Sequence, residues 1–373
     1  MPSAKVVNIT WARSGGRCHY PGCNRDLIGD LVSGNEDAKF GFVAHIVADK
    51  PGGPRGDEVR SPQLADEPDN LMLLCSTHHK LIDVDELDRH PEGLLLQYKK
   101  SHEDRISVQT GITAERASHI LLYGAKVGDH TPLVSYGQAA AAMVPDWYPA
   151  ERHPMEIQIT GAYEKDKDPL YWSTEIRALR EGFAERVKPR IARREVNHLS
   201  VFGIAPMPLL VELGRLLGDI TPAQVYQLRR EPVPGWQWTK GAAAQFTTSK
   251  RIGKDANRRA VALILELSAT VTADRVTAVL GADISIFSIS TPVPDRDIIR
   301  GPGDLSAFRA LLRRTLDEIK ALSTEVEIHV FPAAPVSTII ELGRVWMPKG
   351  DLPLVIYDET PGHGFMPRHR IAP

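Results

Sequence analysis

The stretch 201-VFGIAPMPLLVELGR-215 decides the fold of the second half of this chain, because it recurs as 330-VFPAAPVSTIIELGR-344. Eight of the fifteen positions are identical, without a gap, at a constant offset of 129 residues. Each copy has the apolar run of a buried strand, a turn at an Ala-Pro pair and then the periodicity of a helix. This self-similarity favours a duplicated strand-turn-helix unit over convergence of two unrelated ones.

Around both copies, apolar runs alternate with helical stretches from about residue 155 to the end. The runs are MEIQIT, LSVFGIA, AVALILELSA, DISIFSIS, VEIHVF and LPLVIYD. Such alternation predicts an α/β layer fold with a largely parallel sheet. We therefore expect two Rossmann-like halves, at about 153–255 and 256–373. Ligands of such sheets bind beyond the carboxyl ends of the strands, where helix N-termini attract anions, so two facing copies predict a near-symmetric ligand with two or more phosphates.

The residues of this pocket are predicted from their place at equivalent turns or at the rim. Aromatic side chains there can stack on a base, although core or interface packing is the alternative for each of them. The candidates are Pro206, Met207, Pro335, Val336 and Ser337 at the repeated turns, Tyr163, Lys165 and Trp172 before the first helix, and Trp236 and Trp238 in PGWQWTKG.

The first part of the chain, up to about residue 107, contains all three cysteines. CHYPGC carries Cys18 and Cys23, and Cys75 and His78 have the spacing of a second knuckle. Three sulfurs and one nitrogen form a tetrahedral set that suits a closed structural Zn²⁺ site. The alternatives are that Cys18 and Cys23 are unrelated buried thiols, or that His19 competes as a ligand.

Three further polar residues interleave with these knuckles: His45 ends an apolar strand, Asn70 leads the strand LMLL, and His79 follows His78 on a helix. This order over residues 11–90 resembles the HNH nuclease family and its ββα-metal finger. Phosphodiester hydrolysis needs a base for water and a cation for the developing charge. The resemblance implies that His45 is the general base, that Asn70 orients the loop carrying it, and that His79 binds a catalytic Mg²⁺ or similar divalent cation. The alternatives are an ordinary strand-end histidine at 45 and a turn residue at 70.

The sequence departs from the family at Ala44, where many members carry a second metal ligand. Asp83 or Asp49 could supply it, or water and phosphate could complete the shell, since Mg²⁺ commonly keeps several waters. Arg55 and Lys80 are candidate DNA phosphate contacts, with ordinary solvation as the alternative. Because residues 1–110 hold 13 Lys and Arg against 17 Asp and Glu, we expect a single module to bind duplex DNA poorly.

Taken together, a zinc-containing HNH finger and a duplicated Rossmann-like half resemble the HNH-SAVED effector nucleases of cyclic-oligonucleotide-based antiphage signalling (CBASS). The resemblance implies an α+β nuclease domain at 1–107, a connecting helix and linker at 108–152, and at 153–373 a SAVED domain of two CARF-like repeats. It also implies a cyclic di- or trinucleotide activator made by a partner nucleotidyltransferase, and a homo-oligomer, a dimer that grows when activated.

Bulk composition agrees with a cytoplasmic effector. The formal net charge of −2 argues against a strongly basic nucleic-acid-binding surface, and neither a signal peptide nor a membrane-spanning apolar stretch is expected. We therefore expect a metal-dependent endonuclease that degrades double-stranded DNA without strong sequence specificity after its activator binds. The alternatives are a restriction-type nuclease whose C-terminal domain reads DNA, and a zinc-stapled binding module without catalysis.

Overall fold

The computed structural model divides the chain into two compact units, Met1–Thr113 and Ala114–Pro373, which are described separately. The residues described are 1–30, 35–128, 130, 134–158, 166–219, 221–231, 233–254, 260–322, 326–360 and 362–373. Within these ranges no helix is long and apolar enough to cross a bilayer.

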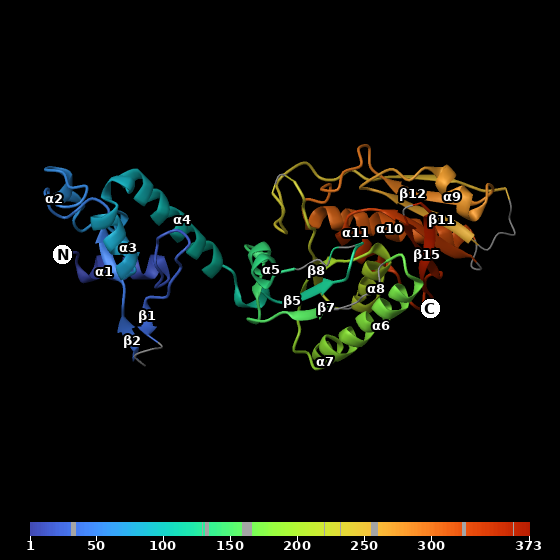
Figure 1. The fold of residues 1–373 in the computed structure, drawn as a ribbon, viewed down its shortest axis with the longest axis horizontal. Helices are drawn as coiled ribbons and strands as arrows, with labels where there is room; N and C mark the ends of the chain where they lie inside the picture. The colour runs from blue at the N-terminus through green and yellow to red at the C-terminus, as the bar shows by residue number, and fades with distance from the viewer. Residues whose placement is uncertain are drawn as a thin grey trace. The chain divides into compact units, whose positions relative to one another are not determined.

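Unit 1 is built around two short antiparallel strands and the helix that follows them, which Figure 1 labels α3. Its elements are α1 (Ala4–Ser14), β1 (Ile28–Asp30), β2 (Asn35–Lys39), β3 (Phe42–His45), α2 (Arg60–Leu64), η1 (Pro68–Asn70), β4 (Leu71–Leu74), α3 (Ser76–Lys80), η2 (Leu81–Asp85), η3 (Leu87–Arg89) and α4 (Glu92–Thr110). Strand β3 pairs with β4 so that His45 lies opposite Leu71. The order strand, strand, helix therefore places the candidate residues on one small scaffold.

Local sequence explains these elements. Ser3 caps α1 by accepting the N–H of Val6, and Gly15, at φ 60°, ends the helix in the left-handed conformation that glycine adopts without strain. All four residues of β4 are buried, which is why LMLL shows no alternation of apolar and polar residues. The core of the unit therefore forms directly beside the Cys75 knuckle.

Unit 2 contains the duplicated halves. Its elements are η4 (Ala114–Arg116), β5 (Ala117–Gly124), α5 (Tyr136–Met143), β6 (Tyr148–Pro149), β7 (Met155–Gln158), α6 (Pro169–Arg186), α7 (Lys188–Ala192), β8 (Leu199–Ile204), α8 (Met207–Leu217), β9 (Ala223–Val225), β10 (Thr247–Arg251), β11 (Ala260–Glu266), α9 (Ala273–Leu280), β12 (Ser285–Ser290), α10 (Pro302–Leu322), β13 (Glu327–Ala333), α11 (Val336–Val345), β14 (Leu354–Thr360) and β15 (Gly364–Ile371).

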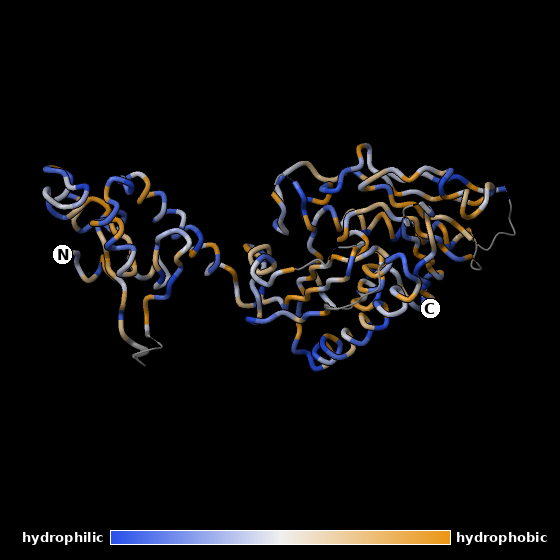
Figure 2. The backbone as a smooth tube through the Cα atoms, viewed as in Figure 1, coloured by the Kyte–Doolittle hydropathy of each residue, from blue (hydrophilic) through white to orange (hydrophobic). Residues whose placement is uncertain are grey.

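The two halves form two sheets. The first is parallel, in the order β6-β5-β8-β9 with β7 also pairing with β5, and the second is β10-β12-β11-β13-β14-β15 with antiparallel edge strands. Each copy of the repeated stretch forms a strand and the following helix, β8-α8 and β13-α11. In Figure 2 the turn from α6 into α7 is largely hydrophilic, whereas β5 and β8 are largely hydrophobic. The prediction of an α/β fold with two Rossmann-like halves is confirmed.

The connecting helix was predicted within residues 108–152, and this prediction is wrong for residues 117–124. Ala117–Gly124 forms strand β5, whose last five residues are buried, and the segment from Ala114 belongs to unit 2. Because β5 is buried on both faces, its apolar residues run continuously and cannot be told from a helix by periodicity. The helix before the boundary is α4, which ends at Thr110.

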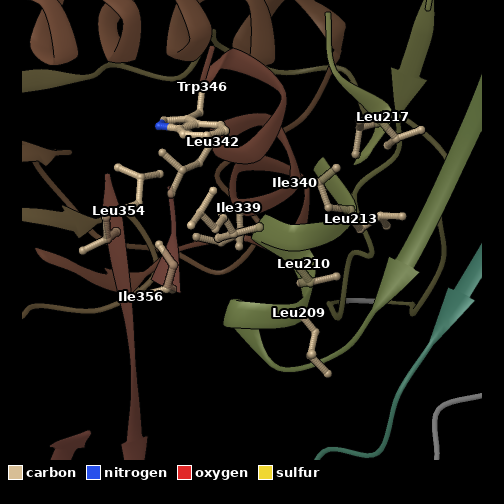
Figure 3. Packing of buried hydrophobic residues seen from close by; sticks show 14 of the residues in the cluster. Leu209, Leu210, Leu213, Leu217, Ile339, Ile340, Leu342, Trp346, Leu354 and Ile356 are labelled. Atoms are coloured by element: carbon tan, nitrogen blue, oxygen red, sulfur yellow. The ribbon is translucent and has the colours of Figure 1, made fainter. Parts of the chain in front are cut away.

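Helices α8 and α11 of the two repeats cross at their glycines. A Cβ on Gly343 would overlap the carbonyl oxygen of Val211 and come within 2.9 Å of the Cα of Gly214, and a Cβ on Gly214 would meet Ile340 in the same way. Figure 3 shows the apolar side chains of the two helices around this crossing, Leu213 close to Ile340. The repeated glycine is therefore needed for the close approach of the two helices.

The repeated Glu and Arg are explained by buried ion pairs beside the same crossing. Glu212 is fully buried and contacts Arg180, Arg215 and His369, and its partner in the second copy, Glu341, is fully buried against Arg309 and Arg344. Burial opposes ionisation of Glu212, but the hydrogen bonds from Arg215, His369 and Arg180 hold its pKa well below the usual range. The repeated Glu and Arg residues therefore stabilise the joint between the repeats.

Replacing Gly343 with alanine is expected to lower the free energy of unfolding of unit 2 by about 3 kcal/mol, because the helices must move apart to admit a Cβ. Gly137→Ala in α5 is the matched control: nothing lies within 4 Å of its Cβ position, so we expect no loss and up to about 1 kcal/mol of gain. Urea unfolding of both variants measures the difference. Equal stability of the two variants would refute the tight crossing.

Candidate functional site

Cys18, Cys23, Cys75 and His78 come together in unit 1. Their ligand atoms all lie within 4.8 Å of one another, and His78 Nδ1 is 3.6 Å from Cys18 Sγ and 3.2 Å from Cys75 Sγ. Tetrahedral Zn²⁺ with Zn–S near 2.3 Å and Zn–N near 2.0 Å holds neighbouring ligand atoms roughly 3.5–3.8 Å apart. The four side chains therefore fit a zinc ion with little movement.

The surroundings of the cluster keep its ligands in place. Cys75 precedes α3 and its backbone N–H donates to Cys18 Sγ at 3.5 Å, while the Tyr20 ring stacks on His78 with centroids 4.0 Å apart. Burial raises the pKa of the Cys18 thiol to about 12. A thiol with such a pKa stays protonated at neutral pH unless a cation stabilises the thiolate. The three sulfurs and one nitrogen of the cluster suit such a cation.

His19 does not belong to the cluster. Its Nδ1 accepts the backbone N–H of Leu73 at 2.9 Å, and its Nε2 lies 3.5 Å from Glu103 Oε1. Glu103 also pairs with the buried Lys99. His19 therefore braces α4 against β4, and the competing ligand considered from the sequence is not supported by this geometry.

His45 lies at the end of β3, half-buried, with its Nε2 3.0 Å from the carbonyl oxygen of Ala65. A carbonyl can only accept, so in the neutral ring Nε2 must carry the proton and donate it. Nδ1 then keeps its lone pair. This is the tautomer that a general base requires.

Asn70 forms a clamp behind His45. Its Oδ1 accepts the N–H of Val47 at 2.8 Å, and its Nδ2 donates to the carbonyl oxygens of Val47 at 2.8 Å and Leu64 at 3.1 Å. Asn70 is 5% exposed, so these bonds are shielded from water. It therefore holds both the chain that follows His45 and the residue next to Ala65, which is the arrangement an orienting role needs.

His79 is paired with an acid from its own helical segment. The segment after α3 continues as a π-helical turn, and Asp83 Oδ2 lies 3.3 Å from His79 Nε2. Burial opposes ionisation of Asp83, but the hydrogen bonds from His79 and Arg55 lower its pKa. Phe42 stacks on His79 with centroids 4.9 Å apart, and Ala44, two residues along β3, shares that face of the strand. Asp83 is thus the acid that lies beside His79, and it is one of the two candidates for the ligand that Ala44 cannot supply.

The candidate phosphate contacts differ in their surroundings. Arg55 donates from Nε to Ile46 O at 2.6 Å, from Nη1 to Ile82 O at 2.8 Å and from Nη2 to Asp83 Oδ1 at 2.5 Å, with its side chain 9% exposed. The interpretation of Arg55 as a DNA contact needs correction: all three nitrogens already bond within the protein. Lys80 is 67% exposed beside Asp85, so it stays accessible to a phosphate.

Unit 2 has a cavity of about 360 Å³ at the carboxyl ends of its strands. Its lining includes the two repeated turns, and four predicted residues are among them, Pro206, Met207, Pro335 and Val336. The volume is in the range of small-molecule sites, roughly 300–1,000 Å³. The turns of the two halves therefore meet at one site, as the duplication predicted.

Four other predicted pocket residues lie in the described ranges, and none of these four lines this cavity. Trp236 is 2% exposed and packs edge-on against Phe202, Trp238 stacks on Tyr226, and Trp172 is 4% exposed. Their large rings bury apolar area in the core, which was the alternative interpretation for each. Ser337 is buried beneath the cavity, where its hydroxyl donates to Gln227 Oε1 at 2.7 Å. Tyr163 and Lys165 lie outside the described residues.

The lining residues that were not predicted include Asp166, Gln227, Arg230, Arg296 and Asp358. Burial, with the nearby charge of Asp166, raises the pKa of Asp358 to about 7. A signal for Asp358 was present, since it is the last residue of the predicted strand LPLVIYD and so lies at a carboxyl end. The loop residues Gln227, Arg230 and Arg296 had no such signal.

Comparison with known proteins gives the following findings. Residues 179–371 match the family of the SMODS-associated and fused to various effectors sensor domain, SAVED. The Acinetobacter baumannii Cap4 SAVED/CARF-domain containing receptor with the cyclic trinucleotide 2'3'3'-cAAA is similar at 12% identity and a TM-score of 0.45, covering 74% of this chain and 56% of that chain. The Moraxella osloensis Cap4 SAVED/CARF-domain containing receptor is similar at 10% identity and a TM-score of 0.40, covering 74% of this chain and 54% of that chain. This chain thus spans little more than half of either receptor. No curated protein matches it.

Proposed function

The chain belongs to the SAVED family of sensor domains, and from this premise we propose that it is a sensor-effector in which a cyclic di- or trinucleotide binds unit 2 and switches on DNA cleavage by unit 1. The observation that carries the sensing part is the cavity at the carboxyl ends of both halves. Helices α8 and α11 start at its lining turns, and Arg230 and Arg296 are exposed there. Helix N-termini and guanidinium groups both favour phosphates.

For unit 1 we propose hydrolysis of phosphodiester bonds. His45 Nδ1 takes the proton of a water molecule, whose oxygen attacks phosphorus, and the bond to the leaving sugar oxygen breaks. The hydrogen bond from Nε2 to Ala65 O stabilises the imidazolium that results, and Asn70 keeps the strand end fixed. The hydrogen bond from His45 Nε2 to Ala65 O and the buried contacts of Asn70 support this role, because an ordinary surface histidine would lack both.

A catalytic divalent cation would be held by His79 and Asp83. Their 3.3 Å separation is close to the roughly 3.0 Å between adjacent ligands of an octahedral ion with bonds near 2.1 Å. Bound Mg²⁺ would supply charge for the transition state and leaving oxygen. Arg55 holds the other oxygen of Asp83, so Oδ2 and the neighbouring His79 Nε2 are the atoms that would bind the cation.

A structural Zn²⁺ would be held by Cys18, Cys23, Cys75 and His78, all four ligand positions being filled by protein. Such a closed site leaves no position for substrate, so this zinc serves stability rather than chemistry. It joins the loop after α1 to the start of α3, the helix that carries His79. The zinc thereby keeps one end of the catalytic finger in place.

Control by the sensor requires that the activator bind the cleaving arrangement better than the idle one. We propose that binding changes a homo-oligomer and brings nuclease units together on double-stranded DNA. The excess of acidic over basic residues in 1–110 supports this, because a single unit would bind duplex DNA weakly.

The test is degradation of plasmid DNA with Mg²⁺ against a panel of cyclic di- and trinucleotides, with oligomer mass measured in parallel. We expect one or few rings to produce a smear without discrete fragments and a larger oligomer. Discrete fragments without any ring would favour the restriction-type alternative. A ring that binds and never elicits cleavage would favour the binding module, and a panel with no binding ring would refute the sensor.

A further inference from the structure

The cavity of unit 2 combines acidic and basic groups in an arrangement that goes beyond phosphate binding. Arg230 and Arg296 line it as exposed cations, and Asp166 and Asp358 line it as carboxylates. Phosphates would be repelled by carboxylates, so the two acids must meet another part of the ligand. This inference rests on the proposed function, since it concerns the ligand of the same cavity.

Asp358 stands out among the lining residues by its place in the fold. It lies near the carboxyl end of β14, which runs parallel to β13, and β13 leads into the lining turn at Ala334 and Pro335. Asp166 is anchored by the backbone N–H of Gly128, which donates to its Oδ2 at 2.9 Å. Asp358 accepts the backbone N–H of Glu359, and among the described residues no Lys or Arg forms an ion pair with it, so its carboxylate keeps acceptor capacity for a ligand.

Bases differ in what they can offer to a carboxylate. The Watson–Crick edge of guanine presents two adjacent N–H donors, N1–H and N2–H, which fit the two oxygens of one carboxylate. Adenine presents one donor beside an acceptor, which would face a carboxylate oxygen unfavourably and instead suits an amide. A partly buried carboxylate therefore selects guanine, because a mismatch leaves polar groups unpaired away from water.

We propose that Asp358 is a specificity-determining residue of the sensor, whose carboxylate reads the N1–H and N2–H of a guanine, so that the activating ring contains at least one guanine. Arg230 and Arg296 then face the phosphates, and Asp166 borders the base.

The protonation of Asp358 gives this proposal a second readout. Its pKa is raised to about 7, mainly by burial and by Asp166, while Arg368 and the backbone N–H of Glu359 oppose the rise and the charge of Glu359 adds to it. Tyr171 also faces it, and Arg230 and Arg296 line the same cavity. Guanine binds the ionised form, so protonation competes with the ligand. Affinity for a guanine ring should fall about tenfold from pH 8 to pH 6, whereas a base that accepts the carboxyl proton would bind more tightly on acidification.

The experiment measures binding of cyclic di-GMP, cyclic GMP-AMP, cyclic di-AMP and cyclic tri-AMP, in their 3′–5′ and 2′–5′ linkage forms, to the full chain by calorimetry. We expect wild type to bind a guanine ring, and Asp358→Asn to weaken it about tenfold to a hundredfold while gaining affinity for the adenine ring of the same linkage. The asparagine is isosteric, so folding is not at risk. Asp219→Asn, an exposed aspartate of the same unit that lies outside the lining, is the matched control and should change neither affinity.

The outcomes separate this inference from the proposed function. Wild type that binds adenine-only rings as tightly as guanine rings overturns the role of Asp358 and leaves the sensor standing. An Asp358→Asn protein that prefers guanine rings as strongly as wild type has the same consequence. Wild type that binds no ring at all overturns both.

Discussion

Replacing His45 with alanine is expected to lower the rate of activated DNA cleavage by about 10²- to 10⁴-fold, because no group remains to take the proton of the attacking water. Ligand binding by unit 2 and the zinc content should not change, since His45 contacts neither the cavity nor the Cys and His cluster. Single-turnover cleavage at saturating activator measures the loss. Retention of more than a tenth of the wild-type rate would refute the general base.

Asp83→Asn provides the contrast that separates proton transfer from cation binding. An amide oxygen is a weaker ligand than a carboxylate, so this variant should need more Mg²⁺ and regain activity as the cation concentration rises. His45→Ala should show no such rescue. His153→Ala, an exposed histidine outside both sites, controls for loss of a histidine as such. Identical Mg²⁺ dependence of Asp83→Asn and wild type would remove Asp83 from the cation site.

Replacing Cys18 with serine is expected to remove the zinc ion and unfold unit 1. Structural zinc sites contribute apparent free energies of about 10–16 kcal/mol at neutral pH, more than the whole stability of an ordinary small domain. Calorimetry should lose one unfolding transition and keep that of unit 2, and elemental analysis should find no zinc. A variant that melts like wild type would show that packing alone holds the unit.

The adjacent residues His78 and His79 provide a matched pair of variants for testing which side chain binds zinc. His78→Ala removes a predicted ligand and should lose zinc and stability, whereas His79→Ala should retain one zinc per chain and lose cleavage. Both variants remove the same side chain from the same short helix. If the two behave alike in zinc content, the assignment of His78 rather than His79 to the cluster is wrong.

Local spacing was enough to predict the metal cluster. Each knuckle is a short segment, Cys18 to Cys23 and Cys75 to His78, and a short segment can direct its ligands to one point whatever the rest of the fold does. The repeat was equally informative, because identical residues 129 apart imply equivalent turns. This is why four predicted turn residues line the cavity.

Side-chain partners across the fold were not predictable in the same way. Arg55 was predicted to contact a DNA phosphate, yet it bonds to the carbonyls of Ile46 and Ile82, which only the folded unit brings to it. Trp236 looked like a stacking platform, and packing against Phe202 buries it instead. Strand β5 looked helical, because burial on both faces removes the alternation that distinguishes a strand.

By itself the sequence determined which residues repeat, which could ligate a metal and that the second half alternates strands with helices, because these depend on neighbours along the chain. Only the tertiary structure decided that Arg55 turns inward onto Asp83, that Asp358 borders the cavity and that Gly214 meets Gly343. These three depend on segments far apart in sequence, whereas the approach of Asp83 to His79 follows from their spacing of four residues on one helical segment. Contacts of these kinds are set by packing, in which the whole chain takes part.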